Sequence, residues 1–117
     1  MFIDNLTPPP ASAPWYFNST LFAIWGGNTD VFLASDEADW PAKSNQLLET
    51  YKAQVTRLMA VGGRAFLFLN IPPIDRTPGM LKQSEAKRAA VASAIITFNT
   101  ALSDYATALA NEFYFSL

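Results

Sequence analysis

Two short, uninterrupted apolar runs, at residues 20–25 and 65–70, constrain the fold of this chain more than any other feature. Neither run alternates apolar with polar residues, which is typical of strands buried on both faces of a parallel sheet. Between them, residues 43–61 carry apolar side chains at helical spacing. Gly62 and Gly63 follow directly and favour a helix stop. The sequence therefore predicts an α/β unit in which a helix connects two parallel strands.

The rest of the chain extends this pattern on both sides. Residues 1–16 are rich in proline, which removes backbone donors, so we expect a connecting loop there. Residues 81–112 carry apolar side chains at intervals of three and four and predict a long helix. The aromatic residues at 112–117 predict the beginning of a third strand.

The composition suggests that the core of this chain is part of a larger one. With 117 residues the chain allows one domain, yet 50% of its residues are hydrophobic and only 15% are charged. A chain this short buries about two-thirds of its unfolded surface and needs more polar covering than this. We therefore expect residues 1–117 to form a single incomplete domain that lacks neighbouring strands.

Charge and residue usage exclude several classes of protein and site. The net charge is −2 without a basic cluster, which argues against nucleic acid as a partner. No apolar run reaches the roughly 20 residues of a membrane span. The chain has neither cysteine nor histidine, so thiolate and imidazole metal sites are excluded, and so is the commonest general base. No metal and no cofactor is expected.

Signals of cellular location are few. Residues 1–4 lack the charged and apolar pattern of a secretory signal. Two Asn-x-Thr sequons begin at Asn5 and Asn18 and indicate either a secreted parent protein or ordinary polar loops. The location of the chain itself is left open.

Polar residues follow each predicted strand. Because ligands bind beyond the carboxyl ends of parallel strands, we expect the two following loops to share one edge of the sheet. Asn28 offers an uncharged amide donor there. The same residues also suit an ordinary strand-to-helix turn, and Asp75 and Arg76 also suit an ion pair within their loop. The side chains and backbone expected to line a cleft around Asn28 are Gly27, Thr29, Asp30, Pro72, Asp75 and Arg76.

These two loops carry a resemblance to a known family. Residues 19–31 resemble the third conserved block, G-x-N-D after an apolar strand, of the SGNH or GDSL-type ester hydrolases. Residues 62–78 are similar to the next strand of that family and its Pro-Pro loop. Residues 13–15 resemble the preceding loop in the fungal acetylesterase-like branch, and Asn99 and Leu102 fit the following helix. The resemblance covers nearly the whole chain in the right order.

The resemblance implies a three-layer α/β/α fold of flavodoxin-like topology. It also implies a serine that attacks acetyl or other short acyl esters, including carbohydrate esters, with a histidine oriented by an aspartate. In this family an asparagine side chain of the third block stabilises the oxyanion, and it matches Asn28 here, with Gly26 as the structural glycine of the block. Thr29 stands between Asn28 and Asp30, where the family pattern has none. The family parent is expected to be secreted.

The remaining machinery of the family is missing from this sequence. There is no Gly-Asp-Ser block, none of the serines lies in a nucleophile-like context, and there is no histidine. We therefore expect a fragment of an ester hydrolase that is inactive by itself. The alternative is a non-catalytic α/β remnant that binds a partner through its apolar sheet edge, or an unstable truncated gene product.

Overall fold

A two-stranded parallel sheet is the centre of the fold. The computed structural model describes residues 7–12 and 14–116, with side chains up to Glu112. Two of the three residues of the first sequon, Asn5 and Leu6, therefore lie outside the described residues. So does Ala13, the first residue of the loop that resembles the acetylesterase-like branch. Strand β1 (Leu21–Ile24) pairs with β2 (Ala65–Phe68) in parallel. The two predicted strands thus lie side by side in the same direction.

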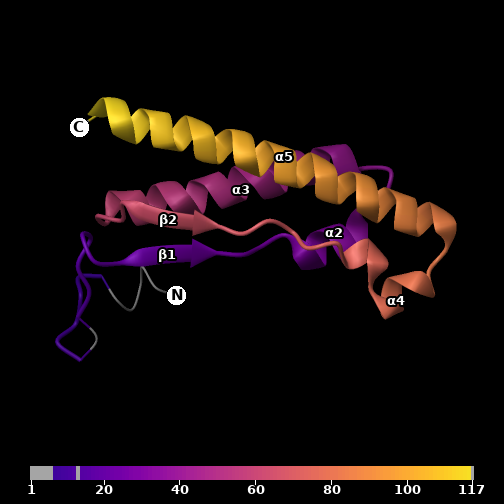
Figure 1. The fold of residues 1–117 in the computed structure, drawn as a ribbon, viewed down its shortest axis with the longest axis horizontal. Helices are drawn as coiled ribbons and strands as arrows, with labels where there is room; N and C mark the ends of the chain where they lie inside the picture. The colour runs from indigo at the N-terminus through magenta and orange to yellow at the C-terminus, as the bar shows by residue number, and fades with distance from the viewer. Residues whose placement is uncertain (1–6, 13, 117) are drawn as a thin grey trace.

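Helices make up most of the remaining structure, so the chain is a mixed α/β protein. They are α2 (Asn28–Ala34), α3 (Trp40–Ala60), the 3₁₀ turn η1 (Ile74–Arg76), α4 (Pro78–Leu81) and α5 (Glu85–Ser116). In Figure 1, α3 and α5 lie together beside the sheet, whereas α2 and α4 lie near the carboxyl ends of the strands. None of the helices in the described part of the chain is long and apolar enough to cross a membrane.

The helix predicted at 43–61 begins slightly earlier, at Trp40, and ends at Ala60. Pro41 lies in its first turn, where a missing N–H costs nothing because no intrahelical acceptor is available. At the other end Gly62 has a φ of +106°, and its N–H donates to the carbonyl of Met59 across 3.1 Å. This left-handed residue stops α3 and turns the chain back into β2.

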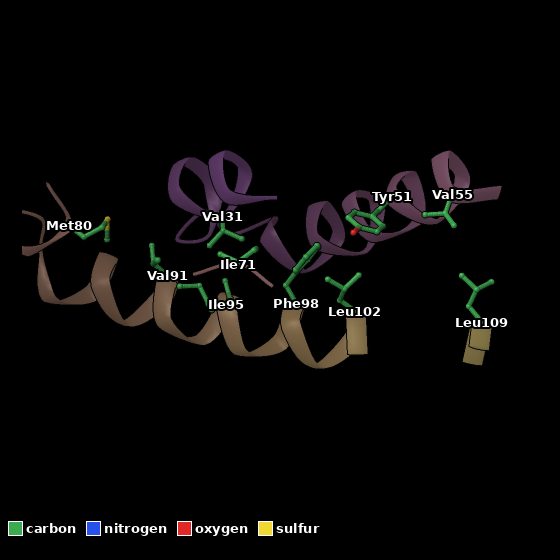
Figure 2. Close-up of a cluster of buried hydrophobic side chains, with 11 residues drawn as sticks. Val31, Tyr51, Val55, Ile71, Met80, Val91, Ile95, Phe98, Leu102 and Leu109 are labelled. Atoms are coloured by element: carbon green, nitrogen blue, oxygen red, sulfur yellow. The ribbon is translucent and has the colours of Figure 1, made fainter. Parts of the chain in front are cut away.

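One face of the sheet packs against α3 and α5. Phe66 and Phe68 stack along this face, and the ring of Phe68 stacks on Tyr105 of α5 with centroids 5.8 Å apart. Beyond the sheet, one side of α5 faces α2, α3 and the loop after β2 (Figure 2). The buried residues that α5 contributes to this core are Val91, Ala94, Ile95, Phe98, Leu102 and Leu109.

The opposite face of the sheet is open, so the prediction that both strands are buried on both faces is wrong. Leu21 of β1 is 60% exposed and Leu67 of β2 is 48% exposed, whereas Phe22 is buried. Side chains of a strand alternate between faces, and no described segment covers the outer one. Leu21 and Leu67 therefore leave apolar surface exposed on this face of the sheet.

The third strand predicted at 112–117 is also wrong, because α5 continues to Ser116. Residues 80–117 contain neither glycine nor proline, and apolar residues recur at helical spacing through Leu102, Tyr105 and Leu109. Nothing in this segment therefore stops the helix. At its start the predicted helix is divided, with α4 ending at Leu81 and α5 beginning at Glu85.

Tyr51 connects α3 to both the sheet and α5. It is buried, and its ring centroid lies 5.7 Å from that of Phe68 and 6.3 Å from that of Phe98. Its hydroxyl donates to the carbonyl of Ile24 across a long 3.4 Å. Burial raises the pKa of Tyr51 to about 12, and the neighbouring phenol of Tyr105 adds to the effect.

The raised pKa makes the stability of the fold sensitive to alkali. Folding favours the neutral phenol, so this contribution of Tyr51 is complete below its ordinary pKa of 10.0 and is lost as the pH rises toward about 12. We expect Tyr51→Phe to reduce this alkaline loss while costing little at neutral pH, because the hydrogen bond is long. Urea unfolding followed by circular dichroism across this pH range measures both. An identical alkaline loss in the variant would contradict the role of Tyr51.

Candidate active site

The loops after β1 and β2 meet at one edge of the sheet, beyond the carboxyl ends of the strands, and Asn99 of α5 holds the loop after β2 there. Its side-chain oxygen accepts a hydrogen bond from the N–H of Ile71 at 2.8 Å, and its Nδ2 donates to the carbonyl of Ile71 at 3.0 Å. The side chain of Ile71 is 2% exposed and lies against Gly27 of the other loop. The prediction that both loops share one edge is confirmed by the parallel pairing.

The two glycines after β1 differ in what the structure requires of them. Gly27 has a φ of +96°, and a Cβ built on it would lie 3.3 Å from both Ile71 Cδ1 and Phe98 Cζ. A Cβ on Gly26 would meet nothing within 4 Å. Gly27 also precedes the first residue of α2, so the backbone here does form a strand-to-helix turn. The structural constraint therefore falls on Gly27.

The difference between the two glycines affects how residues 26–30 are aligned with the G-x-N-D pattern that they resemble. From Gly26, the pattern G-x-N-D places its asparagine at Asn28 and then meets Thr29 instead of aspartate. From Gly27, the same pattern places Thr29 at the asparagine position and Asp30 at the aspartate position. Both Asn28 and Thr29 are therefore candidates for the polar group of this block.

Asn28 and Thr29 line one hollow at this edge, which we call the Asn28 hollow. Its volume is about 270 Å³, and its lining residues are Asn28, Thr29, Phe32, Leu33, Ile74 and Thr77. Asn28 is half-buried, and its Oδ1 is buried without a hydrogen-bond partner among the described residues. With the oxygen turned inward, the carboxamide has only its N–H₂ group left to offer a ligand.

The other predicted lining residues lie elsewhere. Asp30 lines a separate hollow of about 310 Å³ together with Trp40 and Lys43. Asp75 and Arg76 line a third, beside Asn99, and no ion pair between them is found in the described part of the chain. The suggested ion pair within their loop is therefore wrong.

Gly27 and Pro72 do not line the Asn28 hollow either. Gly27 is covered by Ile71 and Phe98, as described above. Pro72 is half-buried, and its carbonyl accepts from the N–H of Ile74 at 2.7 Å. Of the residues predicted to surround Asn28, only Thr29 lines the same hollow.

Sequence reasoning missed the apolar walls of the hollow and the role of Asn99. Phe32 and Leu33 are 36% and 62% exposed, although they belong to an apolar run of α2. Asn99 lies next to Phe98 on the apolar side of the predicted helix, and this position could have indicated its role. A polar group in such a place requires a partner, and exposed backbone of a loop is a common one.

The described residues supply no complete catalytic set. The Asn28 hollow is lined by neither serine nor a carboxylate, and the sequence has no histidine. In residues 7–12 and 14–116, no three side chains of the metal-ligating types gather closely enough to hold a metal ion. The geometry thus presents a polar donor in an apolar hollow without a nucleophile.

Comparison with known proteins relates the chain to an esterase. It is 33% identical over 102 residues to an acetylesterase from Thermothelomyces thermophilus, which covers 86% of this chain. The similarity supports an esterase relationship. The matched part is 34% of the relative, so the chain spans about a third of its length. No family profile and no solved structure matches the chain.

The contrast between the two glycines gives a matched test. We expect Gly27→Ala to destabilise the fold by about 2 kcal/mol or more, because a left-handed residue with a Cβ costs about 1–2 kcal/mol and close contacts add to that. Gly26→Ala is the control and should change stability by less than about 0.5 kcal/mol. Chemical unfolding of both variants measures this. Equal losses would show that Gly27 is not the constrained position.

Proposed function

We propose that this chain is the central part of an SGNH or GDSL-type ester hydrolase that acts on acetyl or other short acyl esters, carbohydrate esters included. The observation that carries the proposal is the Asn28 carboxamide, which lines an apolar hollow beyond the carboxyl ends of two parallel strands. This is the place where α/β sheets bind their ligands. The similarity to an acetylesterase over most of the chain supports the same reaction class.

In the proposed reaction Asn28 stabilises the oxyanion. When a serine oxygen attacks the ester carbonyl, the carbonyl oxygen gains negative charge, and a preorganised N–H donor lowers the energy of that state. The Nδ2 of Asn28 suits this role because the Oδ1 of the same carboxamide is buried, which leaves the N–H₂ group to donate to a ligand. Phe32, Leu33 and Ile74 surround it with apolar surface. A hydrogen bond to a charged oxygen is stronger in such surroundings than in water.

The same hollow gives the acyl group a place to bind. A short acyl chain is apolar, and burying it against these side chains is favourable by roughly 0.8 kcal/mol for each CH₂ group. The alcohol part of the ester would then face the outside of the hollow. A carbohydrate alcohol is compatible with this arrangement, because the hollow needs to enclose only the acyl end.

Thr29 is the neighbouring candidate for the donor, favoured by the count from Gly27 and by its place in the same hollow. Its hydroxyl can donate one hydrogen bond, whereas the amide of Asn28 can donate two. Asn28 is half-buried and Thr29 is exposed, so the amide is held in place more firmly. We therefore assign the role to Asn28.

The chain by itself is proposed to be inactive, because a nucleophilic serine and a histidine base would have to come from other polypeptide. Without them only binding and oxyanion stabilisation remain. The alternative of a non-catalytic remnant has less support, since the similarity to an acetylesterase extends over 86% of the chain. Activity is thus proposed for the parent protein.

A chimera makes the role of Asn28 measurable. Residues of this chain replace the matched stretch of the Thermothelomyces acetylesterase, and hydrolysis of para-nitrophenyl acetate is followed. We expect Asn28→Ala to lower kcat by about 10²–10³ with little change in KM, because one oxyanion donor is lost. Thr29→Ala should lower kcat far less. The isolated chain should show no turnover above spontaneous hydrolysis.

Asn45→Ala is the control, because Asn45 is an exposed asparagine of α3 that does not line the Asn28 hollow. A larger loss for Thr29→Ala than for Asn28→Ala would move the donor role to Thr29. An active chimera in which neither change lowers kcat would refute an oxyanion role for this loop.

A further inference from the structure

We propose that a hollow between the beginning of α3 and the first half of α5 is a binding site for a neutral sugar ring. The hollow has a volume of about 370 Å³, and we call it the Ser35 hollow. It shares no lining residue with the Asn28 hollow. The proposal concerns binding alone and does not rest on ester hydrolysis.

The hydroxyl of Ser35 points to a ligand in this hollow. Ser35 directly follows α2 and is 8% exposed, and its Oγ is buried without a hydrogen-bond partner among the described residues. A buried hydroxyl without a partner is costly, so such groups nearly always have one. Because Ser35 lines the hollow, a molecule bound there can supply the missing hydrogen bond.

An ion pair holds Ser35 in place beside α5. The Nζ of Lys87 on α5 donates to the Oδ1 of Asp36 at 2.7 Å, and the side chain of Lys87 is only 14% exposed. Asp36 is the next residue after Ser35, so this contact fixes the end of α2 against α5. A polar group that is already held in position loses less conformational entropy when a ligand binds to it.

The other polar groups of the hollow are uncharged. Ser44, Ser93 and Thr97 add three hydroxyl groups, and none of the described residues that line the hollow is charged. A hydroxyl group both donates and accepts hydrogen bonds, as the hydroxyl groups of a sugar do. An anionic ligand would find no lysine or arginine in the lining to pair with. The lining therefore favours a neutral ligand with several hydroxyl groups.

The remaining walls are apolar and include an aromatic ring. Trp40 is half-buried and lines the hollow, while Ala90 and Ala94 leave room on the α5 side because each ends in one methyl group. A sugar ring has C–H groups on its faces, which pack against an indole, and hydroxyl groups at its rim. Apolar walls with a few polar groups are typical of ligand pockets, whose volumes are about 300–1,000 Å³.

Titration with neutral sugars, followed by NMR, tests the proposal. The probes are the methyl β-pyranosides of glucose, galactose, mannose and xylose, added separately to the full chain at millimolar concentrations. We expect at least one of them to shift the indole N–H signal of Trp40 and the amide signals of Ser35 and Ser93 until the site is saturated. The indole signal of Trp25, which does not line the hollow, should stay in place. Inorganic phosphate should shift none of these signals.

Ser35→Ala separates a ligand-binding hydroxyl from a structural one. We expect this change to weaken binding of the best glycoside by about threefold to tenfold, because one hydrogen bond is lost. The urea midpoint of unfolding should stay the same or rise, because a buried group without a partner is removed. Ser103→Ala, at an exposed position of α5 outside the hollow, is the control and should change neither value. A lower midpoint for Ser35→Ala with unchanged binding would contradict the proposal.

Filling the hollow is an independent test. Ala90→Trp places a large side chain in the hollow, whereas Ala89→Trp lies at an exposed position outside it and is the matched control. We expect Ala90→Trp to abolish the glycoside-induced shifts and Ala89→Trp to preserve them. If Ala90→Trp does not fold, as judged by circular dichroism, the pair of serine variants decides.

Three results would overturn the proposal. The first is that none of the four glycosides causes a saturable shift, which would leave water as the partner of Ser35. The second is that phosphate shifts the signals instead, which would make the ligand an anion. The third is binding that the folded variants leave unchanged. None of these measurements uses ester hydrolysis, so failure here and failure of the proposed function are separate results.

Discussion

The two hydrogen bonds between Asn99 and the backbone of Ile71 hold the candidate site together. Ile71 lies between β2 and the 3₁₀ turn η1 and belongs to neither. The side chain of Asn99 satisfies both of its backbone groups, at 2.8 and 3.0 Å. Ile71 is thereby pressed against Gly27, and Ile74 is carried to the side of α2 where Asn28 begins the helix. An unmet backbone group in the same place would cost about 1–3 kcal/mol.

Much of the fold follows from local patterns in the sequence. Apolar spacing located both long helices, the two unbroken apolar runs located the strands, and Gly62 marked the end of α3. The same reasoning failed where the outcome depends on what lies next to an element. The apolar residues of β1 and β2 predicted cover on both faces, but the cover for Leu21 and Leu67 comes from no described segment. At residues 112–117 aromatic side chains suit a strand or a helix equally. Because nothing before them stops α5, the helix continues to Ser116.

The candidate site was predictable only in part. The pattern after β1 pointed to Asn28, whose amide does line a hollow, but it did not show that Gly27 rather than Gly26 is the constrained glycine. That difference arises from contacts with Ile71 and Phe98, which are distant in sequence. Asp30, Asp75 and Arg76 line other hollows. They do so because side chains in consecutive turns of the backbone point in different directions. The shape of the site thus depends on the position of the loop after β2.

Hydrogen exchange at the amide of Ile71 measures the central contact directly. We expect this amide to exchange much more slowly than that of the exposed neighbour Asn70, because Asn99 Oδ1 accepts its hydrogen bond. In Asn99→Ala the Ile71 amide should lose this protection while amides in the middle of α3 keep theirs. Equally fast exchange of Ile71 and Asn70 in the unmodified chain would contradict the role given to Asn99, and with it the assembly of the Asn28 hollow.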